Sequence, residues 1–312
     1  MTHEQASPSS LIKWIVAARP WALPASTMPV FFGTSLAVVI GGAQLDVGRF
    51  LLALLAMIVL HSAANMLSDV FDYKRGLDTQ VTPVSGAIVR GWLTARAVAT
   101  AAIVLFVLGS GLGLVLVAVT GRLLLVIGAA GVVIGALYTL LKYNTLGDLA
   151  VFLNFGILGG LGSWVVQTGS FSLIPTLWTV PMAMLVIAIL HANNWRDTIT
   201  DSERKVRTFA AVLGDKGSLA YYALLIFGSM ALLALFILVP RLVAMDFPAM
   251  PWTFVAVAAA LPLALRLWGR AVRRREPRSP MDFVILDGAT AQYNLVFGLL
   301  CTGSVWLSYA VR

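Results

Sequence analysis

The sequence is short of the residues on which soluble and disulfide-bonded proteins depend. Only 12% of its 312 residues are charged, whereas a soluble domain carries about 25%. Its single cysteine, Cys301, lies in an apolar run, so no disulfide framework can form within the chain. One cysteine and three histidines also give no Cys/His cluster of the kind that holds zinc. A soluble domain, a disulfide scaffold and a zinc site are therefore not expected.

Apolar residues, in contrast, make up 59% of the chain, and the mean hydropathy is +0.89. These values indicate an integral membrane protein. The net charge of +8 and the pI near 10 would suggest nucleic-acid binding in a soluble protein. In a membrane protein they are typical of loops that face an anionic leaflet. We therefore expect membrane lipid, and no nucleic acid, among the partners.

Nine apolar runs of about 20 residues predict membrane-spanning helices. The expected fold class is all-α, a polytopic bundle of about nine transmembrane helices around a central cavity that opens to the cytoplasm. Residues 1–16 are expected to form a disordered or interfacial lead-in, and residues 17–312 a single transmembrane domain. The predicted spans are 21–40, 50–70, 96–119, 122–141, 148–168, 177–195, 219–240, 251–270 and 286–310.

The basic residues predict how the chain is oriented. With nine spans, the N-terminal segment and the loops after spans 2, 4, 6 and 8 share one side and hold 18 of the 22 basic residues. Because Lys and Arg collect in cytoplasmic loops, the protein is predicted to cross the cytoplasmic membrane with its N-terminus inside and its C-terminus outside. The opposite side keeps Arg49, Arg122, Arg241 and Arg312.

Two polar clusters stand at the ends of apolar runs on the predicted cytoplasmic side. In the first, HSAANMLSDVFDYKRGLD, Asn65, Asp69 and Asp72 follow at i, i+4 and i+7. The second, HANNWRDTITDSERKVRT, has Asn193, Asp197 and Asp201 at i, i+4 and i+8. On a helix each set shares one face. Two such faces at one membrane edge predict a site for divalent cations and a diphosphate.

Carboxylates at this spacing suit Mg²⁺, which takes oxygen ligands from one or two carboxylates, phosphate and water. The alternative is that each cluster pairs with neighbouring bases, Lys74 and Arg75 or Arg196 and Arg204. Matching Asn-x-x-x-Asp spacing in both clusters favours the metal interpretation. The histidines that open the two stretches, His61 and His191, are assigned no role, because a lone histidine at a membrane edge is more often a packing residue.

A diphosphate also needs cationic donors near the two clusters. Lys142 is the only base in the short loop after the fourth span, and Tyr138 precedes it by one helical turn. Lys205 and Arg207 follow the second cluster, and Arg19 precedes the first span. We expect these residues to bind the substrate.

The two stretches, together with ARPWALPAS at 18–26 and YTLLK, resemble the motifs of the UbiA superfamily of membrane aromatic prenyltransferases. LGDLAVFLNFG, VQTGS, NNWRD and TAQYNLVFGLL are most similar to its menaquinone branch, whose members prenylate 1,4-dihydroxy-2-naphthoate. The likeness runs from about residue 17 to 306. Ser68 stands where the first motif usually has a second Asn beside the Asp. Gly76 stands where the 4-hydroxybenzoate branch has a third Asp, and Asp78 takes its place, as in the menaquinone branch.

The resemblance implies Mg²⁺-dependent transfer of a polyprenyl group from polyprenyl diphosphate to an aromatic acceptor. In the menaquinone branch that acceptor is dihydroxynaphthoate, and the reaction releases CO₂. Two Mg²⁺ ions would be held by Asp69, Asp72, Asp197 and Asp201, with Asn65 and Asp78 as further ligands, and Lys142 would act with them. Asn193 and Asn194 would join the substrate site. Candidates for an aromatic lining are Phe71, Tyr138, Phe152, Phe155, Trp164 and Tyr293.

Two alternatives remain open. Another acceptor, such as 4-hydroxybenzoate, would keep the same chemistry. A cation-coupled secondary transporter would use the acidic residues as an ion path. Against transport, the charges gather at one face and not at the midplane, and nine spans do not divide into equal halves.

Overall fold

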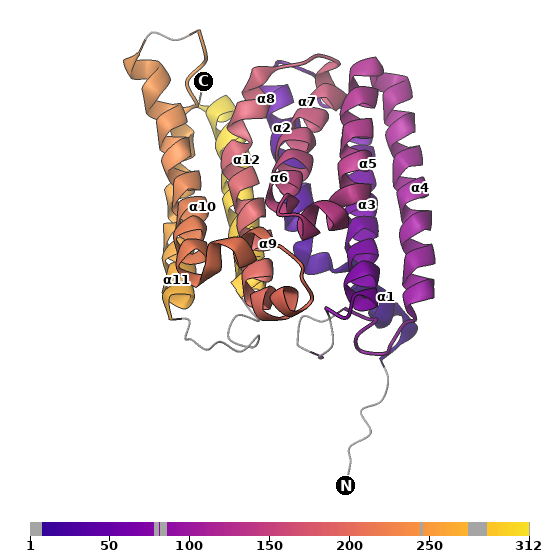
Figure 1. The fold of residues 1–312 in the computed structure, drawn as a ribbon. Helices are drawn as coiled ribbons and strands as arrows, with labels where there is room; N and C mark the ends of the chain where they lie inside the picture. The colour runs from indigo at the N-terminus through magenta and orange to yellow at the C-terminus, as the bar shows by residue number, and fades with distance from the viewer. Residues whose placement is uncertain (1–7, 78–80, 82–85, 244–245, 274–285, 312) are drawn as a thin grey trace.

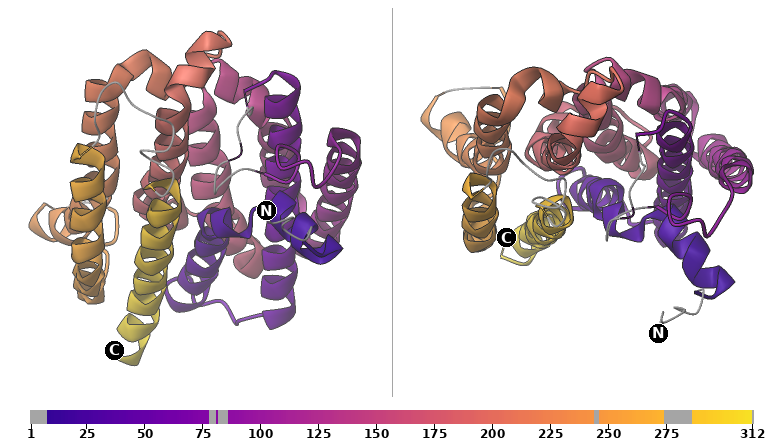
Figure 2. Two further views of the ribbon diagram at one scale, coloured as in Figure 1. Left: turned by 90° about the horizontal axis from the view of Figure 1, so that it is seen from below. Right: turned by 60° about the horizontal axis from the view of Figure 1, so that its bottom comes forward.

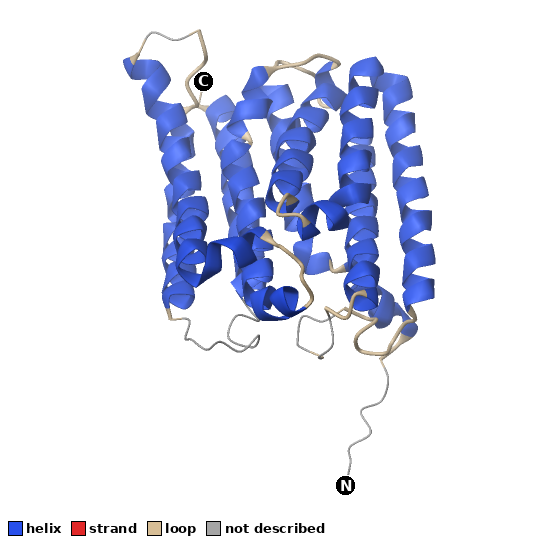
Figure 3. Ribbon diagram, viewed as in Figure 1, coloured by secondary structure: helices blue, strands red, loops and turns tan. Residues whose placement is uncertain are grey.

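The computed structural model describes residues 8–77, 81, 86–243, 246–273 and 286–311. Every regular element in these ranges is helical (Figure 3). The first half comprises α1 (Ser10–Ala18), η1 (Pro20–Ala22), α2 (Pro24–Val39), α3 (Val47–Lys74), α4 (Ala95–Thr120), α5 (Arg122–Tyr143) and α6 (Gly147–Val151). The second comprises η2 (Phe152–Leu158), α7 (Gly159–Thr168), α8 (Leu173–Trp178), α9 (Val180–Glu203), α10 (Phe209–Leu242), η3 (Trp252–Ala260), α11 (Leu261–Val272) and α12 (Leu286–Ala310).

The protein is a polytopic membrane protein, and each predicted span overlaps a helix. Seven helical stretches of the described chain are long and apolar enough to cross a membrane. An eighth candidate arises if Ser10–Ala22 and Pro24–Val39, which are bent by 56°, form one span. The last predicted span corresponds to α12, which does not satisfy the same hydropathy test. Residues 10–16 of the expected lead-in belong to α1, and residues 1–7 lie outside the described ranges.

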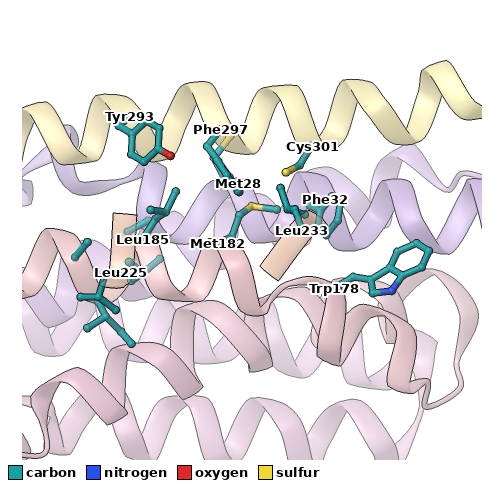
Figure 4. Close-up of a cluster of buried hydrophobic side chains, with 14 of the residues drawn as sticks. Met28, Phe32, Trp178, Met182, Leu185, Leu225, Leu233, Tyr293, Phe297 and Cys301 are labelled. Atoms are coloured by element: carbon teal, nitrogen blue, oxygen red, sulfur yellow. The ribbon is translucent and has the colours of Figure 1, made fainter. Parts of the chain in front are cut away.

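The long helices run side by side, with α3, α4 and α5 in one half of the bundle and α10, α11 and α12 in the other (Figure 1). Two further views show the same separation of early and late helices (Figure 2). Helices α2 and α9 lie between the halves, and both pack on α12. Apolar side chains of α2, α9, α10 and α12 interlock there, among them Met28, Phe32, Met182, Leu233 and Phe297 (Figure 4).

Glycine allows close helix contact at two crossings in this bundle. A Cβ on Gly33 of α2 would overlap the carbonyl oxygen of Gly160 in α7. A Cβ on Gly156 of η2 would overlap Ala183 in α9. In a membrane, close backbone approach at small residues is a main source of helix association. The Gly156 contact holds η2, a π-helical segment, against α9, and π-helical turns are often found at functional sites.

Candidate functional site

The first acidic cluster lies at the C-terminal end of α3. Asp69 is buried, and its Oδ1 accepts a hydrogen bond from Arg19 at 3.0 Å. Arg19 ends α1 in the left-handed conformation, with φ of 55°. The loop that follows α3 returns to the same carboxylate, because a Cβ on Gly86 would overlap Oδ2 of Asp69. Asp69 is therefore enclosed by two segments that are distant in sequence.

Asp72 lies one turn further along α3 and is held by α5. Lys142 donates to its Oδ2 at 3.1 Å, and the hydroxyl of Tyr143 donates to its Oδ1 at 2.7 Å. Ser68 contributes a longer hydrogen bond of 3.4 Å. Both charged groups of the Lys142–Asp72 pair are only 10% exposed. Such a buried pair depends on good geometry and on the additional hydrogen bonds to offset the loss of water.

The second cluster lies at the C-terminal end of α9. Arg196 binds both oxygens of Asp197, each at 2.8 Å, and reaches Asp287 of α12 at 2.9 Å. The amide of Asn193 donates to the same Asp287 oxygen at 3.2 Å. Asp201 is buried, and the hydroxyl of Thr208 is 3.5 Å from its Oδ2. This cluster therefore connects α9 to the start of the last helix.

The two clusters lie at the same end of the bundle and are linked through α5. Lys142 at the end of α5 pairs with Asp72 of the first cluster at 3.1 Å. The backbone joins the same segments, since Thr145 N donates to Arg207 O at 2.9 Å and Arg207 N donates to Tyr143 O at 3.3 Å. Helices α3, α5 and α9 thus converge on one charged region.

A cavity of about 120 Å³ extends from this region into the bundle. It is lined by four of the predicted substrate-binding residues, Arg19, Asn65, Tyr138 and Asn193, as well as by Asp287. A second cavity of about 340 Å³ lies between α3, α4, α5 and α7, and its lining is largely apolar. The two cavities share lining residues in α3, α5 and η2. Together they form a passage from a charged end into an apolar interior.

Other predicted site residues lie outside this passage. Lys205 and Arg207 are exposed, and neither lines the first cavity. Asn194 is buried, and its amide oxygen has no hydrogen-bond partner in the described part of the chain. Asp78 lies outside the described residues. The two histidines lie in different surroundings, because His61 lines both cavities whereas His191 is completely buried.

Of the aromatic residues predicted to line the site, some line the cavities and others lie elsewhere. Tyr138 and Phe155 line the first cavity, and Phe155 also lines the second. Trp164 and Tyr293 are buried in the main core, and Phe152 packs against it. Phe71 is 36% exposed. Trp21, which the sequence did not single out, adds a third aromatic ring to the first cavity.

Pairing with a base beside it in the sequence is seen for Asp197 of the second cluster, but Asp69 and Asp72 of the first cluster also have partners that are distant in sequence. Asp197 pairs with Arg196, the residue beside it, whereas Asp69 and Asp72 pair with bases from other helices. The sequence did not identify Tyr143, Asp287 or Gly86 as site residues. The available signal for Tyr143 was its position beside Lys142, and the signal for Asp287 was an acid at the start of an apolar helix.

Comparison with known proteins identifies the family. The model of the UbiA prenyltransferase family matches residues 26–305. The 1,4-dihydroxy-2-naphthoate octaprenyltransferase of Bacillus subtilis (strain 168) is 31% identical over 296 residues, which cover 93% of this chain and 91% of that protein. The UbiA prenyltransferase domain-containing protein 1 of Xenopus tropicalis is 30% identical over 304 residues, covering 95% and 82%.

Solved structures show the same fold at lower identity. A UbiA homolog from Archaeoglobus fulgidus bound to DMAPP and Mg²⁺ has a TM-score of 0.62 at 15% identity, covering 93% of this chain and 99% of that one. The apo structure of a UbiA homolog from Aeropyrum pernix K1 gives 0.65 at 16% identity, covering 91% and 97%. Because the family model spans most of the chain and the Bacillus subtilis relative aligns along nearly all of it, the protein belongs to the UbiA prenyltransferase family and is a polyprenyl transferase.

Proposed function

We propose that the protein transfers a polyprenyl group from polyprenyl diphosphate to 1,4-dihydroxy-2-naphthoate, with loss of CO₂, giving demethylmenaquinone. The observation that carries the proposal is the passage from the charged end of the bundle into joined, mainly apolar cavities. The charged end of the passage suits the diphosphate group of a prenyl diphosphate, and the apolar cavity suits its hydrocarbon tail. The naphthoate acceptor is supported by the 31% identity to the 1,4-dihydroxy-2-naphthoate octaprenyltransferase of Bacillus subtilis.

The diphosphate would be bound at the charged end. Arg19 and Lys142 lie there, each about 3 Å from a carboxylate, and their cations would donate to diphosphate oxygens. Donors that are already in position stabilise the negative charge that develops on a leaving group without reorganisation. Asn65 and Asn193 line the same cavity and would add neutral donors.

The donor set fits Mg²⁺, which solved UbiA homologs contain beside DMAPP or GPP. Asp69, Asp72, Asp197 and Asp201 would hold it, with Asn65 and Asp78 as further ligands. No group of three or more acids, histidines and cysteines in the described ranges could hold a metal ion. Mg²⁺ commonly takes one or two carboxylates and completes its shell with phosphate oxygens and water, so each ion would draw its further ligands from the diphosphate. When bound, two such ions would neutralise charge on the departing diphosphate.

The prenyl tail would occupy the second cavity. Leu114 of α4 and Leu125 of α5 line this cavity and are also exposed on the outer surface of the bundle, at 58% and 44%. In a bilayer that surface faces lipid, so a long tail could extend from the cavity into the membrane. The rings of Trp21, Tyr138 and Phe155 line the first cavity. Aromatic faces there would stabilise an allylic cation by about 0.5–2 kcal/mol each.

The charged end would face the cytoplasm. The predicted side holds 18 of the 22 basic residues, and such asymmetry marks cytoplasmic loops. In the structure, α1 and the C-terminal end of α12 lie at opposite ends of the bundle (Figure 1). This arrangement is consistent with a cytoplasmic N-terminus and an external C-terminus.

The test is mass spectrometry of the product formed by purified protein with Mg²⁺, a polyprenyl diphosphate and dihydroxynaphthoate. The expected product has gained the prenyl group and lost the carboxylate. A parallel reaction with 4-hydroxybenzoate separates the acceptors, and a product from that ring alone would overturn the naphthoate assignment. Asp69→Ala, Asp72→Ala, Asp197→Ala and Asp201→Ala should each abolish product while leaving the protein folded. Full activity in excess chelator would contradict the metal assignment.

A further inference from the structure

The junction between the two cavities contains two polar side chains in apolar surroundings. Five residues line both cavities, and three of them, Ala64, Gly135 and Phe155, have no polar side-chain group. The other two are His61 of α3 and Asn154 of η2. The junction is therefore a part of the passage, away from its charged end, where an imidazole and an amide from two different elements line both cavities.

His61 is fixed so that one of its ring nitrogens is left for the cavity. Its Nδ1 lies 2.8 Å from the hydroxyl of Ser26 in α2, and its ring stacks on Phe155 with centroids 4.4 Å apart. Nε2 points away from Ser26, and no described residue forms a hydrogen bond with it. The imidazole is held by α2 and η2, so its orientation toward the junction is set before any ligand arrives.

Asn154 is placed in a similar way. Glycines on α5 make room for its amide, since a Cβ on Gly131 would lie 3.1 Å from its Oδ1 and one on Gly135 would lie 3.6 Å from its Nδ2. The side chain is half-buried and lines both cavities, so its amide is open to a molecule bound there. The backbone that carries it is π-helical, a geometry that often marks functional positions.

Both polar side chains line the cavities, and Asn154 is only half-buried, so their free hydrogen-bonding atoms are open to the passage. A molecule that occupies the junction and carries hydrogen-bonding atoms is therefore the expected partner. The prenyl tail has no such atoms. The diphosphate belongs near Asp69, and His61 precedes Asp69 by eight residues, which places it about 12 Å further along α3. The remaining reactant with polar atoms is the aromatic acceptor.

We propose that the imidazole of His61 and the amide of Asn154 hydrogen-bond the ring oxygens of the aromatic acceptor and so hold its ring beside the allylic carbon. The inference rests on the proposed function and adds the acceptor subsite to it. A ring hydroxyl both donates and accepts, so it fits either tautomer of His61. The recognised chemistry is a hydroxylated aromatic ring.

The test uses variants that separate the cavity-facing atoms from the rest of each side chain. His61→Asn keeps an amide near Ser26 but does not reach the cavity, whereas His61→Gln places a polar atom near the position of Nε2. Asn154→Leu removes the second amide. Asn294→Leu is the control, because Asn294 of α12 is a buried amide without a partner in the described structure and lies outside both cavities.

Acceptor and donor KM values, and equilibrium binding of acceptor alone to protein in nanodiscs, are measured for each variant. His61→Asn and Asn154→Leu should raise the acceptor KM and Kd about tenfold or more and leave the donor KM nearly unchanged. His61→Gln should recover part of the loss, and Asn294→Leu should match the wild type. Unchanged acceptor binding in both His61→Asn and Asn154→Leu would overturn the inference.

An acceptor analogue without one ring hydroxyl provides a test that does not depend on the folding of any variant. Wild-type protein should bind it about tenfold more weakly, and His61→Asn or Asn154→Leu should distinguish it less from the full acceptor. Equal binding of both compounds by the wild type would contradict the assignment. If the wild type transfers no prenyl group to any aromatic ring, the proposed function fails. If transfer occurs but these effects are absent, only the acceptor subsite fails.

Discussion

Gly86 offers a sharp test of how closely the site is built around Asp69. In Gly86→Ala the new methyl group would overlap Oδ2 of Asp69. The loop cannot easily retreat, because the next two residues, Ala87 and Ile88, are buried against Val70 of α3. The carboxylate must therefore move, by a distance on the order of 1 Å, and a misplacement of that size costs about 10²-fold in rate.

The assay compares kcat/KM for the prenyl donor, and the Mg²⁺ concentration for half-maximal activity, in wild type and Gly86→Ala. A loss of about 10²-fold corresponds to about 2.7 kcal/mol of transition-state stabilisation. Thermal unfolding in detergent checks that the variant is folded. Gly111→Ala is the matched control, since nothing lies within 4 Å of a Cβ on Gly111 in α4. A folded Gly86→Ala variant with wild-type kcat/KM and Mg²⁺ dependence would refute the reasoning.

Three other substitutions test separate parts of the structure. Tyr143→Phe removes the 2.7 Å hydrogen bond to Asp72. A bond to a charged group contributes about 1.5–3 kcal/mol, so kcat/KM should fall about 10- to 100-fold, and an unchanged rate would show that Lys142 and Ser68 suffice to position Asp72. Gly128→Leu narrows the second cavity at a position where nothing lies within 4 Å of a Cβ, and it should raise KM for long prenyl diphosphates more than for short ones; an equal effect on all lengths would place the tail elsewhere. Gly33→Leu forces α2 away from Gly160, and overpacking costs about 1–3 kcal/mol, so its melting temperature should fall while that of Gly111→Leu stays near wild type.

Helix positions and the faces of the acidic clusters are local properties, and the sequence was sufficient for both. Apolar runs long enough for a bilayer identified the helices from α3 to α11, because a spanning segment must satisfy its own backbone and present apolar side chains to lipid. The spacing of Asn65, Asp69 and Asp72 placed them on one face because helical periodicity is fixed. The last helix was the exception in hydropathy, since it starts with Asp287 and carries many polar residues.

Which residues meet across helices was decided by the tertiary structure. Asp69 pairs with Arg19 and Asp72 with Lys142, partners 50 and 70 residues away, whereas sequence spacing offered Lys74 and Arg75 as the bases beside this cluster. Other contacts depend on how the helices cross and how closely their glycines approach. They are the contact of Gly86 with Asp69, the pairing of Asp287 with Arg196, and the position of His61 and Asn154 between the two cavities. Local periodicity does not encode those crossings, because they are set by the simultaneous packing of all helices in the bundle.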